Sequence, residues 1–257
     1  SQYSGYVARA AKNDQTPTFP TMPVTTATYG DSSFTVSGSV SSKLSVSFMT
    51  DNPNVAIIDD KNVQILNAGE VNISLYQKGA YRGGAYHFPV VSKSQKLIVL
   101  PKTATINVSN AEVENGMPLP EFTYTAEGLL DGDVIGDNVR YTVDGVPTEE
   151  IKCLWTPGDY LLRIIDANLN PNYAFTINPG VLSVKNTLVP SLSYTLEGGQ
   201  MVITYTGVLQ KSTDGGVTWL DVAPVGRELI FVSEMTEVKE CYRAIVDFEP
   251  RVSSIEE

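Results

Sequence analysis

Short alternating hydrophobic runs, separated by turn residues, cover most of the chain. Hydrophobic residues occupy every second position over 71–75, and the same alternation recurs over 97–99, 160–164 and 173–177. A period of two places one set of side chains on one face of a β-strand. The breaks between the runs are rich in Gly, Pro, Asn and Asp, which favour turns. The pattern therefore predicts an all-β chain, and no window has sustained helical periodicity.

The spacing of these runs predicts three consecutive β-sandwich modules. A chain of 257 residues is too long for one small sandwich and suits two or three modules of about 85 residues each. We predict an N-terminal lead-in over 1–15, followed by modules over 16–101, 102–186 and 187–257. Residues 4–12 could form either a short helix or a strand. The expected fold is a tandem chain of immunoglobulin-like β-sandwich modules.

The first module carries a repeat-like pattern of small and β-branched residues. An Asn-Val-Ala-x-Ile stretch is followed by a turn, a short strand and a Gly-x-Val-x-Ile stretch. The matching positions are Asn54, Val55, Ala56, Ile58, Val63, Ile65, Gly69, Val71 and Ile73. This arrangement resembles the bacterial immunoglobulin-like repeats of surface proteins, and the resemblance implies a β-sandwich over 16–101.

The central module has a different set of landmarks. They are the strand opening at Lys102–Val108, Asn115-Gly116-Met117-Pro118 before FTYT, Gly128-Leu129 with Gly132-Asp133, Pro157-Gly158-Asp159-Tyr160, Asn172-Tyr173 and the closing Val181–Val184. Residues 100–185 thereby resemble the MBG family of β-rich repeats, found in bacterial surface proteins associated with mucus binding. Cys153–Trp155 departs from the smaller residues that the family pattern leads us to expect. These landmarks are structural residues, so the resemblance speaks to fold more than to function.

The last module is predicted to contain six short strands. They are SLSYTL, MVITYTG, VLQKS, TWLDV, ELIFVS and CYRAIV. This number fits a minimal immunoglobulin or fibronectin-III sandwich. Residues 251–257 are expected to be a last strand or a frayed end.

The net charge of the chain disfavours some classes of binding partner. The chain has 18 basic and 29 acidic residues, a net charge of −11, which disfavours nucleic acid and anionic membrane as partners. The sequence has no apolar run approaching the roughly 18 to 20 residues of a membrane span, and its first residues lack the apolar core of a signal peptide. Cys153 and Cys241 fall in different modules, so a disulfide would require those modules to pack face to face. We expect two unpaired thiols.

The sequence contains few of the residues and motifs that enzymes use in catalysis. His87 is the single histidine, and the sequence contains no phosphate-binding glycine loop and no metal-ligand spacing of Cys or His. Ser212-Thr213-Asp214-Gly215-Gly216-Val217-Thr218-Trp219 resembles the Asp-box of sialidases and other propellers. It occurs once, and we predict a structural hairpin. The sequence therefore predicts a non-enzymatic protein without a cofactor.

Acidic residues cluster in the central module. Asp131, Asp133 and Asp137, with Glu127 and Asp144 nearby, offer oxygen ligands that could hold Ca²⁺. Their spacing matches no EF-hand, and a solvated loop is the preferred interpretation. They remain weak calcium candidates.

The segment 76–88 is the best candidate for ligand contact. Tyr81, Arg82 and Tyr86 lie on a glycine-rich loop, and such residues are suited to contacting sugars or a protein partner. The alternative is that the tyrosines cover the open end of a sandwich.

Together these features predict an extracellular bacterial surface or secreted protein segment, adhesin-like or a structural spacer. A host glycan, mucin or surface protein is the expected partner, and the chain is expected to be a monomer. Two alternatives remain open, a glycan- or mucin-binding module and an accessory region of a larger secreted enzyme.

Overall fold

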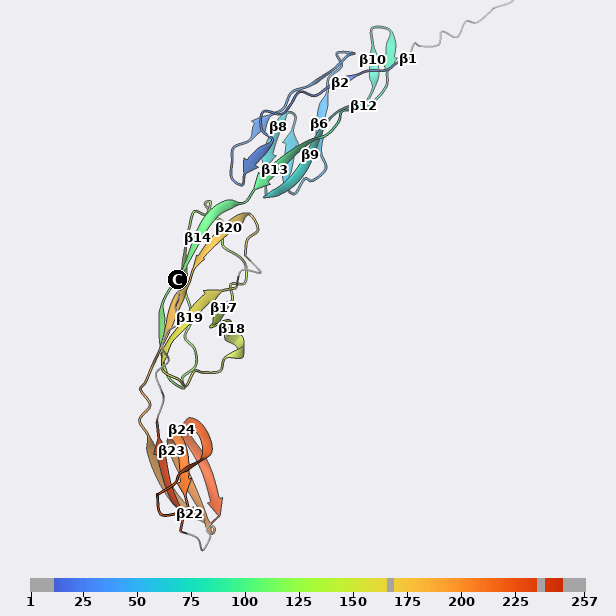
Figure 1. Cartoon of the computed structure of the whole chain (residues 1–257). Helices are drawn as coiled ribbons and strands as arrows, with labels where there is room; N and C mark the ends of the chain where they lie inside the picture. Colours follow the sequence, from blue (N-terminus) through green and yellow to red (C-terminus); the bar gives the residue numbers. More distant parts are fainter. Residues whose placement is uncertain (1–11, 166–168, 235–238, 247–257) are drawn as a thin grey trace, which may run out of the picture. The chain divides into compact units, whose positions relative to one another are not determined.

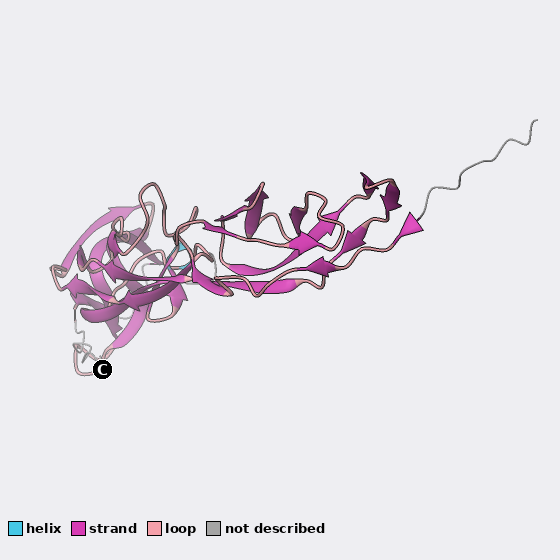
Figure 2. Cartoon of the chain, turned by 90° about the horizontal axis from the view of Figure 1, so that it is seen from above, coloured by secondary structure: helices cyan, strands magenta, loops and turns pink. Residues whose placement is uncertain are grey.

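The structure is a computed structural model, and it describes residues 12–165, 169–234 and 239–246. These residues form β-strands joined by turns and loops, with one 3-10 turn at Thr148–Glu150 (Figure 2). The predicted all-β class is confirmed. In this described part, no helix is long and apolar enough to cross a membrane. Two sequence expectations, a helix or strand within 4–12 and a last strand within 251–257, lie mainly or wholly outside the described residues.

The chain divides into two compact units. Unit 1 comprises Ser1–Ala104, Gly128–Ile135 and Asn170–Thr176, and unit 2 comprises Thr105–Glu127, Gly136–Leu169 and Ile177–Glu257. Residues 102–186, called here the central segment, contribute to both units. The division into three modules stays a prediction.

The main sheet of unit 1 has five strands (Figure 1). Its order is β12 (Val90–Val91), β9 (Gly69–Gln77), β13 (Gln95–Leu100) and β3 (Thr26–Thr28), and β6 (Ser47–Thr50) also pairs with β9. β13 is antiparallel to β9 and parallel to β3. The alternation seen in the sequence places every second residue of β9 and β13 in the core, as expected for a sheet with one covered face.

Smaller sheets complete this part of unit 1. β4 (Phe34–Thr35), β8 (Asn62–Ile65) and β7 (Ala56–Asp59) form one, and β2 (Pro17–Thr18) pairs with β5 (Ser39–Val40). The buried core between the sheets consists of Met22, Ala27, Val36, Val40, Phe48, Val55, Ala56, Val63, Val71, Ile73, Leu75, Leu97 and Val99. Burial of these apolar side chains stabilises this part of unit 1.

A third small sheet carries the predicted ligand loop. β10 (Ala80–Arg82) and β11 (Ala85–His87) form an antiparallel hairpin, and β1 (Lys12–Asn13) runs parallel to β11. The loop predicted over 76–88 is therefore a β-hairpin with defined register.

The central segment contains two sheets. One has the order β16 (Tyr124–Glu127), β14 (Lys102–Val108) and β20 (Tyr173–Asn178). The other has the order β15 (Ala111–Glu114), β21 (Gly180–Lys185), β19 (Gly158–Ile164), β17 (Tyr141–Val143) and β18 (Val146–Pro147). Alternate residues of β19 and β21 are buried, as the sequence pattern predicts.

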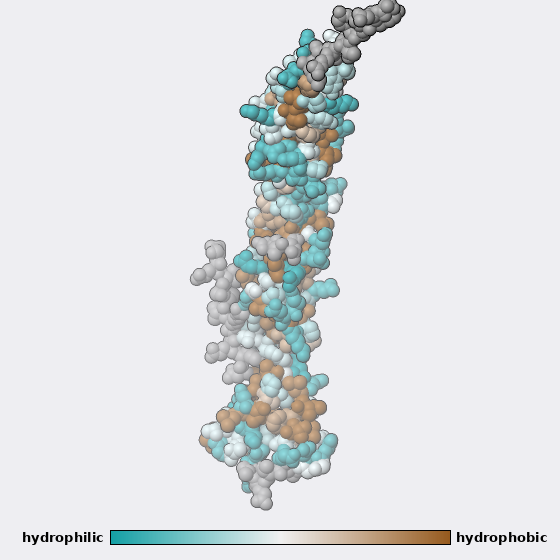
Figure 3. Space-filling model, turned by 90° about the vertical axis from the view of Figure 1, so that its right-hand side faces the viewer, coloured by the Kyte–Doolittle hydropathy of each residue, from teal (hydrophilic) through white to brown (hydrophobic). Residues whose placement is uncertain are grey.

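The number of strands in the C-terminal segment differs from the sequence prediction. Instead of six short strands, the described residues after 187 form β22 (Ser191–Glu197), β23 (Gln200–Ser212), β24 (Leu220–Glu234) and β25 (Cys241–Ile245). The predicted breaks inside β23 and β24 are β-bulges, where Gly207 (φ 107°) faces Gly226 and the ladder shifts register. Glycine permits such a bulge without ending the strand. Hydrophobic side chains of this sheet also reach the surface, at the lower end of the view in Figure 3.

Candidate functional site

The β10–β11 hairpin presents an aromatic pair. Its two-residue turn is Gly83-Gly84, with φ of 60° and 79°, as a type I′ hairpin turn requires. This turn puts Tyr81 directly opposite Tyr86 in the ladder. Their ring centroids are 5.1 Å apart in an edge-to-face arrangement, and Tyr81 is 70% exposed. The two tyrosines named from the sequence therefore form one surface feature.

The hairpin aromatics have different roles. Tyr86 is half-buried and contacts Phe88 edge-to-face at 5.9 Å. Tyr81 is the more exposed of the two tyrosines. Tyr86 thus supports the ring of Tyr81, which is the side chain available for contact.

Arg82, the third predicted residue, connects the hairpin to a different loop. Its guanidinium donates a hydrogen bond to the backbone carbonyl of Lys43. Lys43 has φ of 58°, so its backbone turns sharply just before the chain enters β6. This hydrogen bond fixes the orientation of the guanidinium group and therefore of its other N–H donors.

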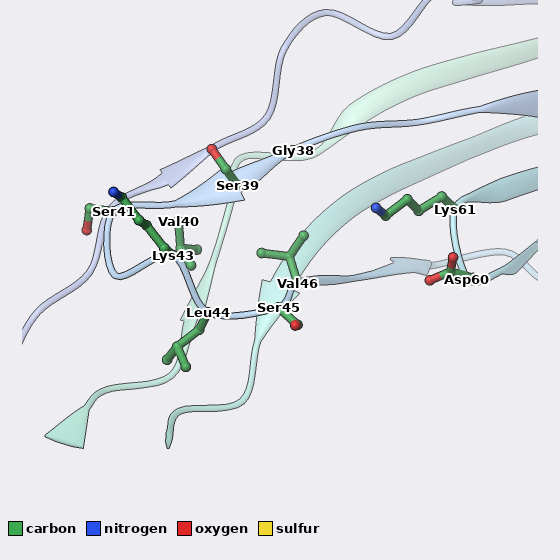
Figure 4. Close-up of a pocket in the computed structure, with 10 residues that line it drawn as sticks. All are labelled: Gly38, Ser39, Val40, Ser41, Lys43, Leu44, Ser45, Val46, Asp60 and Lys61. Carbon is green, nitrogen blue, oxygen red and sulfur yellow. The ribbon is translucent and has the colours of Figure 1, made fainter. Parts of the chain in front are cut away.

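The Lys43 loop borders a cleft of about 620 Å³ (Figure 4). Its lining combines serines, aliphatic side chains and three charged groups. These residues are Gly38, Ser39, Val40, Ser41, Lys43, Leu44, Ser45, Val46, Asp60 and Lys61. Figure 4 shows Lys61 pointing toward Val46, with Lys43 at the other end of the cleft. The sequence carries no local signal for this cleft, because its lining comes from two separate segments, 38–46 and 60–61.

Two buried glutamines hold the hairpin base and the cleft loop together. Gln15 and Gln77 are each 6% exposed, and the Gln15 Nε2 donates to the Gln77 Oε1 at 2.7 Å. Gln15 also receives a hydrogen bond from Ser42 and donates one to the carbonyl of Phe88. Buried amides are stable only with such partners. The network fixes the cleft loop and the hairpin as one surface.

The acidic candidates do not come together. The Asp133 carboxylate accepts hydrogen bonds from two phenols, that of Tyr29 at 3.0 Å and that of Tyr173. Asp131 and Asp137 are exposed. Over the ranges that the structure describes, no group of three or more His, Cys, Asp or Glu side chains could hold a metal ion. Asp133 thus has a structural role that the sequence did not reveal, and calcium binding stays a weak prediction.

The Asp133 contacts also alter the two tyrosines. Burial raises the pKa of both Tyr29 and Tyr173 above its usual value, and the hydrogen bonds to Asp133 raise it further. A neighbouring carboxylate disfavours a phenolate because the two negative charges repel. Both hydroxyls therefore act as hydrogen-bond donors at neutral pH.

The Asp-box residues form the predicted hairpin. The Asp214 carboxylate accepts from the backbone N–H groups of Val217 and Thr218 at 3.0 and 2.9 Å, and from both side-chain hydroxyls at Ser212 and Thr218. These hydrogen bonds, chiefly those from Thr218, hold the pKa of Asp214 far below its usual value. Trp219 donates to the Gly216 carbonyl at 3.0 Å. Every one of these contacts is local to the turn.

The two cysteines and the histidine belong to different compact units. Cys153 and Cys241 are free thiols, as predicted. His87 lies on β11 with its Nε2 3.3 Å from the carbonyl oxygen of Arg82. This contact joins the two strands of the β10–β11 hairpin, so it contributes to the structure of the hairpin.

Asn115 belongs to a buried cluster within unit 2. The residue is fully buried, its N–H donates to the Lys185 carbonyl at 3.0 Å, and its Oδ1 accepts from the Thr187 N–H at 3.3 Å. The Arg227 guanidinium donates to its backbone carbonyl. This cluster fixes the chain where β21 leaves the central segment.

Comparison with known families identifies the central segment. Residues 104–183 match the model of the MBG domain (YGX type), which confirms the resemblance drawn from the sequence. No curated protein matches the chain. The likeness of residues 16–101 to bacterial immunoglobulin-like repeats stays a prediction.

Proposed function

We propose that this chain, which contains an MBG domain of the YGX type, is a non-enzymatic segment of a bacterial surface or secreted protein. It acts as an adhesin-like segment that contacts a host glycan or mucin through the β10–β11 hairpin. The observation that carries the proposal is the exposed Tyr81 ring, supported by Tyr86 in the opposite strand. An exposed aromatic ring suits the apolar face of a sugar.

Two further features support this function. The MBG match is to a family of surface-protein repeats, which agrees with an extracellular place for the chain. The Gln15–Gln77 pair anchors the hairpin base, so the tyrosines are held before a ligand arrives. Preorganisation of this kind lowers the entropic cost of binding.

The test is a glycan and mucin binding screen on the purified chain, followed by titration of each hit against Tyr81→Ala. Removal of a central aromatic contact costs roughly 1 to 2 kcal/mol, or about five- to thirtyfold in affinity. Tyr194→Ala is the matched control, because Tyr194 is 64% exposed on β22 of unit 2. Equal affinity of wild type and Tyr81→Ala for every hit would show that the hairpin is not the contact surface.

A structural spacer is the second candidate. It is favoured by two local features: one residue, Pro101, separates β13 from β14, and the Asn115 cluster ties residues 185–187 to residue 115 within unit 2. Limited proteolysis tests it. Resistance to cleavage at residues 100–102 and 185–187 is the expected result for a spacer, and rapid cleavage there would contradict it.

A further inference from the structure

The hairpin and the cleft have a charge opposite to that of the chain. The whole chain carries −11, with 29 acidic residues. None of them lies within 32–50, which supplies most of the cleft, or within 71–94, which supplies the hairpin. Those two segments hold Lys43, Lys78, Arg82 and Lys93. A basic surface on an acidic protein concentrates an anionic ligand at that place.

The cleft lining offers the partners that an acidic sugar needs. Lys43 and Lys61 supply two ammonium groups, and Asp60 is the single acidic residue among the lining positions. Ammonium groups form strong charge-assisted hydrogen bonds with carboxylate or sulfate oxygens. The hydroxyls of Ser39, Ser41 and Ser45 both donate and accept, which matches the hydroxyl groups of a sugar.

The hairpin adjoins this lining through a direct contact. Arg82 binds the carbonyl of Lys43, so the residue beside Tyr81 in β10 touches the loop that borders the cleft. The buried Gln15–Gln77 pair joins the same two loops from beneath. The hairpin and the cleft loop are therefore joined, with Tyr81 on the opposite face of β10 from Arg82.

We infer that this cleft binds an acidic glycan, with Lys43 and Lys61 at its two ends each pairing with a carboxylate or sulfate group. The inference rests on the proposed glycan-binding function and adds the chemical class of the ligand. The structural elements involved all belong to unit 1.

The experiment compares three forms of one mucin-type oligosaccharide, sialylated, sulfated and neutral, by titration on the full chain. We expect at least one acidic form to bind about tenfold or more tightly than the neutral form, since each charge-assisted contact is worth about tenfold. Affinity for the acidic form should also fall as NaCl rises, because salt screens exposed charges. The sialylated and sulfated arms distinguish the two sources of the negative group.

Substitution locates the site. Lys43→Gln and Lys61→Gln should each weaken binding of the acidic form by about three- to tenfold and leave binding of the neutral form unchanged. Lys152→Gln, at an exposed lysine of unit 2, is the matched control and should have no effect. Circular dichroism of each variant confirms that it folds.

The outcomes separate the inference from the function on which it rests. Equal affinity for the acidic and neutral forms would overturn the acidic specificity. If Tyr81→Ala then weakened binding of both forms, the proposal of glycan binding through the hairpin would still stand. Acid-selective binding that survives both lysine substitutions would overturn the cleft as the site. Binding of none of the three forms, nor of any glycan in the screen, would overturn both proposals.

Discussion

The guanidinium of Arg227 donates two hydrogen bonds to the backbone carbonyl of Asn115, from Nη2 at 2.7 Å and from Nε at 3.1 Å. The same group donates to the Thr187 hydroxyl at 3.1 Å. Arg227 lies on β24, whereas Asn115 follows β15 and is fully buried. One side chain therefore joins three stretches of unit 2 that are remote in sequence.

Replacing Arg227 should destabilise unit 2. In Arg227→Ala the Asn115 carbonyl loses two charge-assisted donors, and each such group is worth roughly 1 to 3 kcal/mol. We expect the free energy of unfolding, measured in urea, to fall by about that amount. Arg163→Ala, at an exposed arginine of β19, is the control and should lie within about 0.5 kcal/mol of wild type. Equal loss in both variants would contradict the role assigned to Arg227.

Gly116 is expected to be intolerant of any side chain. Its φ is 77°, and a Cβ atom there would lie 2.2 Å from the Trp155 ring. Gly145 has a similar φ of 83° and open space around it. Gly145→Ala should therefore cost only backbone strain, about 1 to 2 kcal/mol, and Gly116→Ala should cost about 1 to 3 kcal/mol more because the ring must move. Thermal unfolding of both variants measures the difference. Equal melting temperatures of the two variants would show that the Trp155 ring does not restrict position 116.

Asp214 should make the stability of the C-terminal sheet depend on pH. Its pKa is lowered on folding, so the ionised form stabilises the folded state above the unfolded pKa, and this contribution is lost as pH falls toward the folded pKa. The melting temperature of Asp214→Asn should be lower than that of wild type at pH 7. This difference should become smaller once the pH falls below about 4. Calorimetry over this range tests it. A gap that stays constant to pH 2 would mean that charge is not what Asp214 contributes.

The Tyr29–Asp133–Tyr173 cluster should lose stability at high pH. Both tyrosines have a raised pKa, so their protonated forms stabilise unit 1 below pH 10, and the contribution disappears as pH rises through the folded values. Tyr173→Phe should lower the free energy of unfolding by about 1 to 2 kcal/mol at neutral pH. Tyr124→Phe, at a half-buried tyrosine of unit 2, is the control.

The same cluster gives a test of calcium binding. Both phenol hydroxyls bind the Oδ2 of Asp133, which leaves its Oδ1 for a Ca²⁺ ion, and the described residues form no group of three His, Cys, Asp or Glu side chains around it. We therefore expect the same melting temperature in Ca²⁺ and in chelator. A higher melting temperature in Ca²⁺, abolished in Asp131→Asn with Asp137→Asn, would restore the calcium hypothesis.

The buried strands of unit 1 were predictable because their signal is local. Val71, Ile73 and Leu75 alternate with polar residues in the sequence and are each at most 1% exposed in β9. A period of two determines which face a side chain takes, whatever the rest of the fold does. The same reasoning failed in β23 and β24, since a glycine that permits a bulge looks like a glycine that ends a strand.

The candidate site was predictable only in part. Tyr81 and Tyr86 were found because tyrosines on a glycine-rich segment are a local signal for ligand contact. Lys61 and Gln15 reach the same surface from segments far from the hairpin, and neither carries a local motif. Asp133 was assigned to a possible metal site because it belongs to an acidic run. Its hydrogen bonds to Tyr29 and Tyr173 could not be foreseen, because both tyrosines are distant in sequence.

The parallel pairing of β3 with β13 has a mechanical consequence. Thr26–Thr28 lies on the N-terminal side of unit 1, and Gln95–Leu100 leads through Pro101 into β14. Tension applied to the two ends of the chain would pull these neighbouring strands in opposite directions along their length. The three register pairs that join them would then bear the load in shear and break together instead of unzipping one at a time.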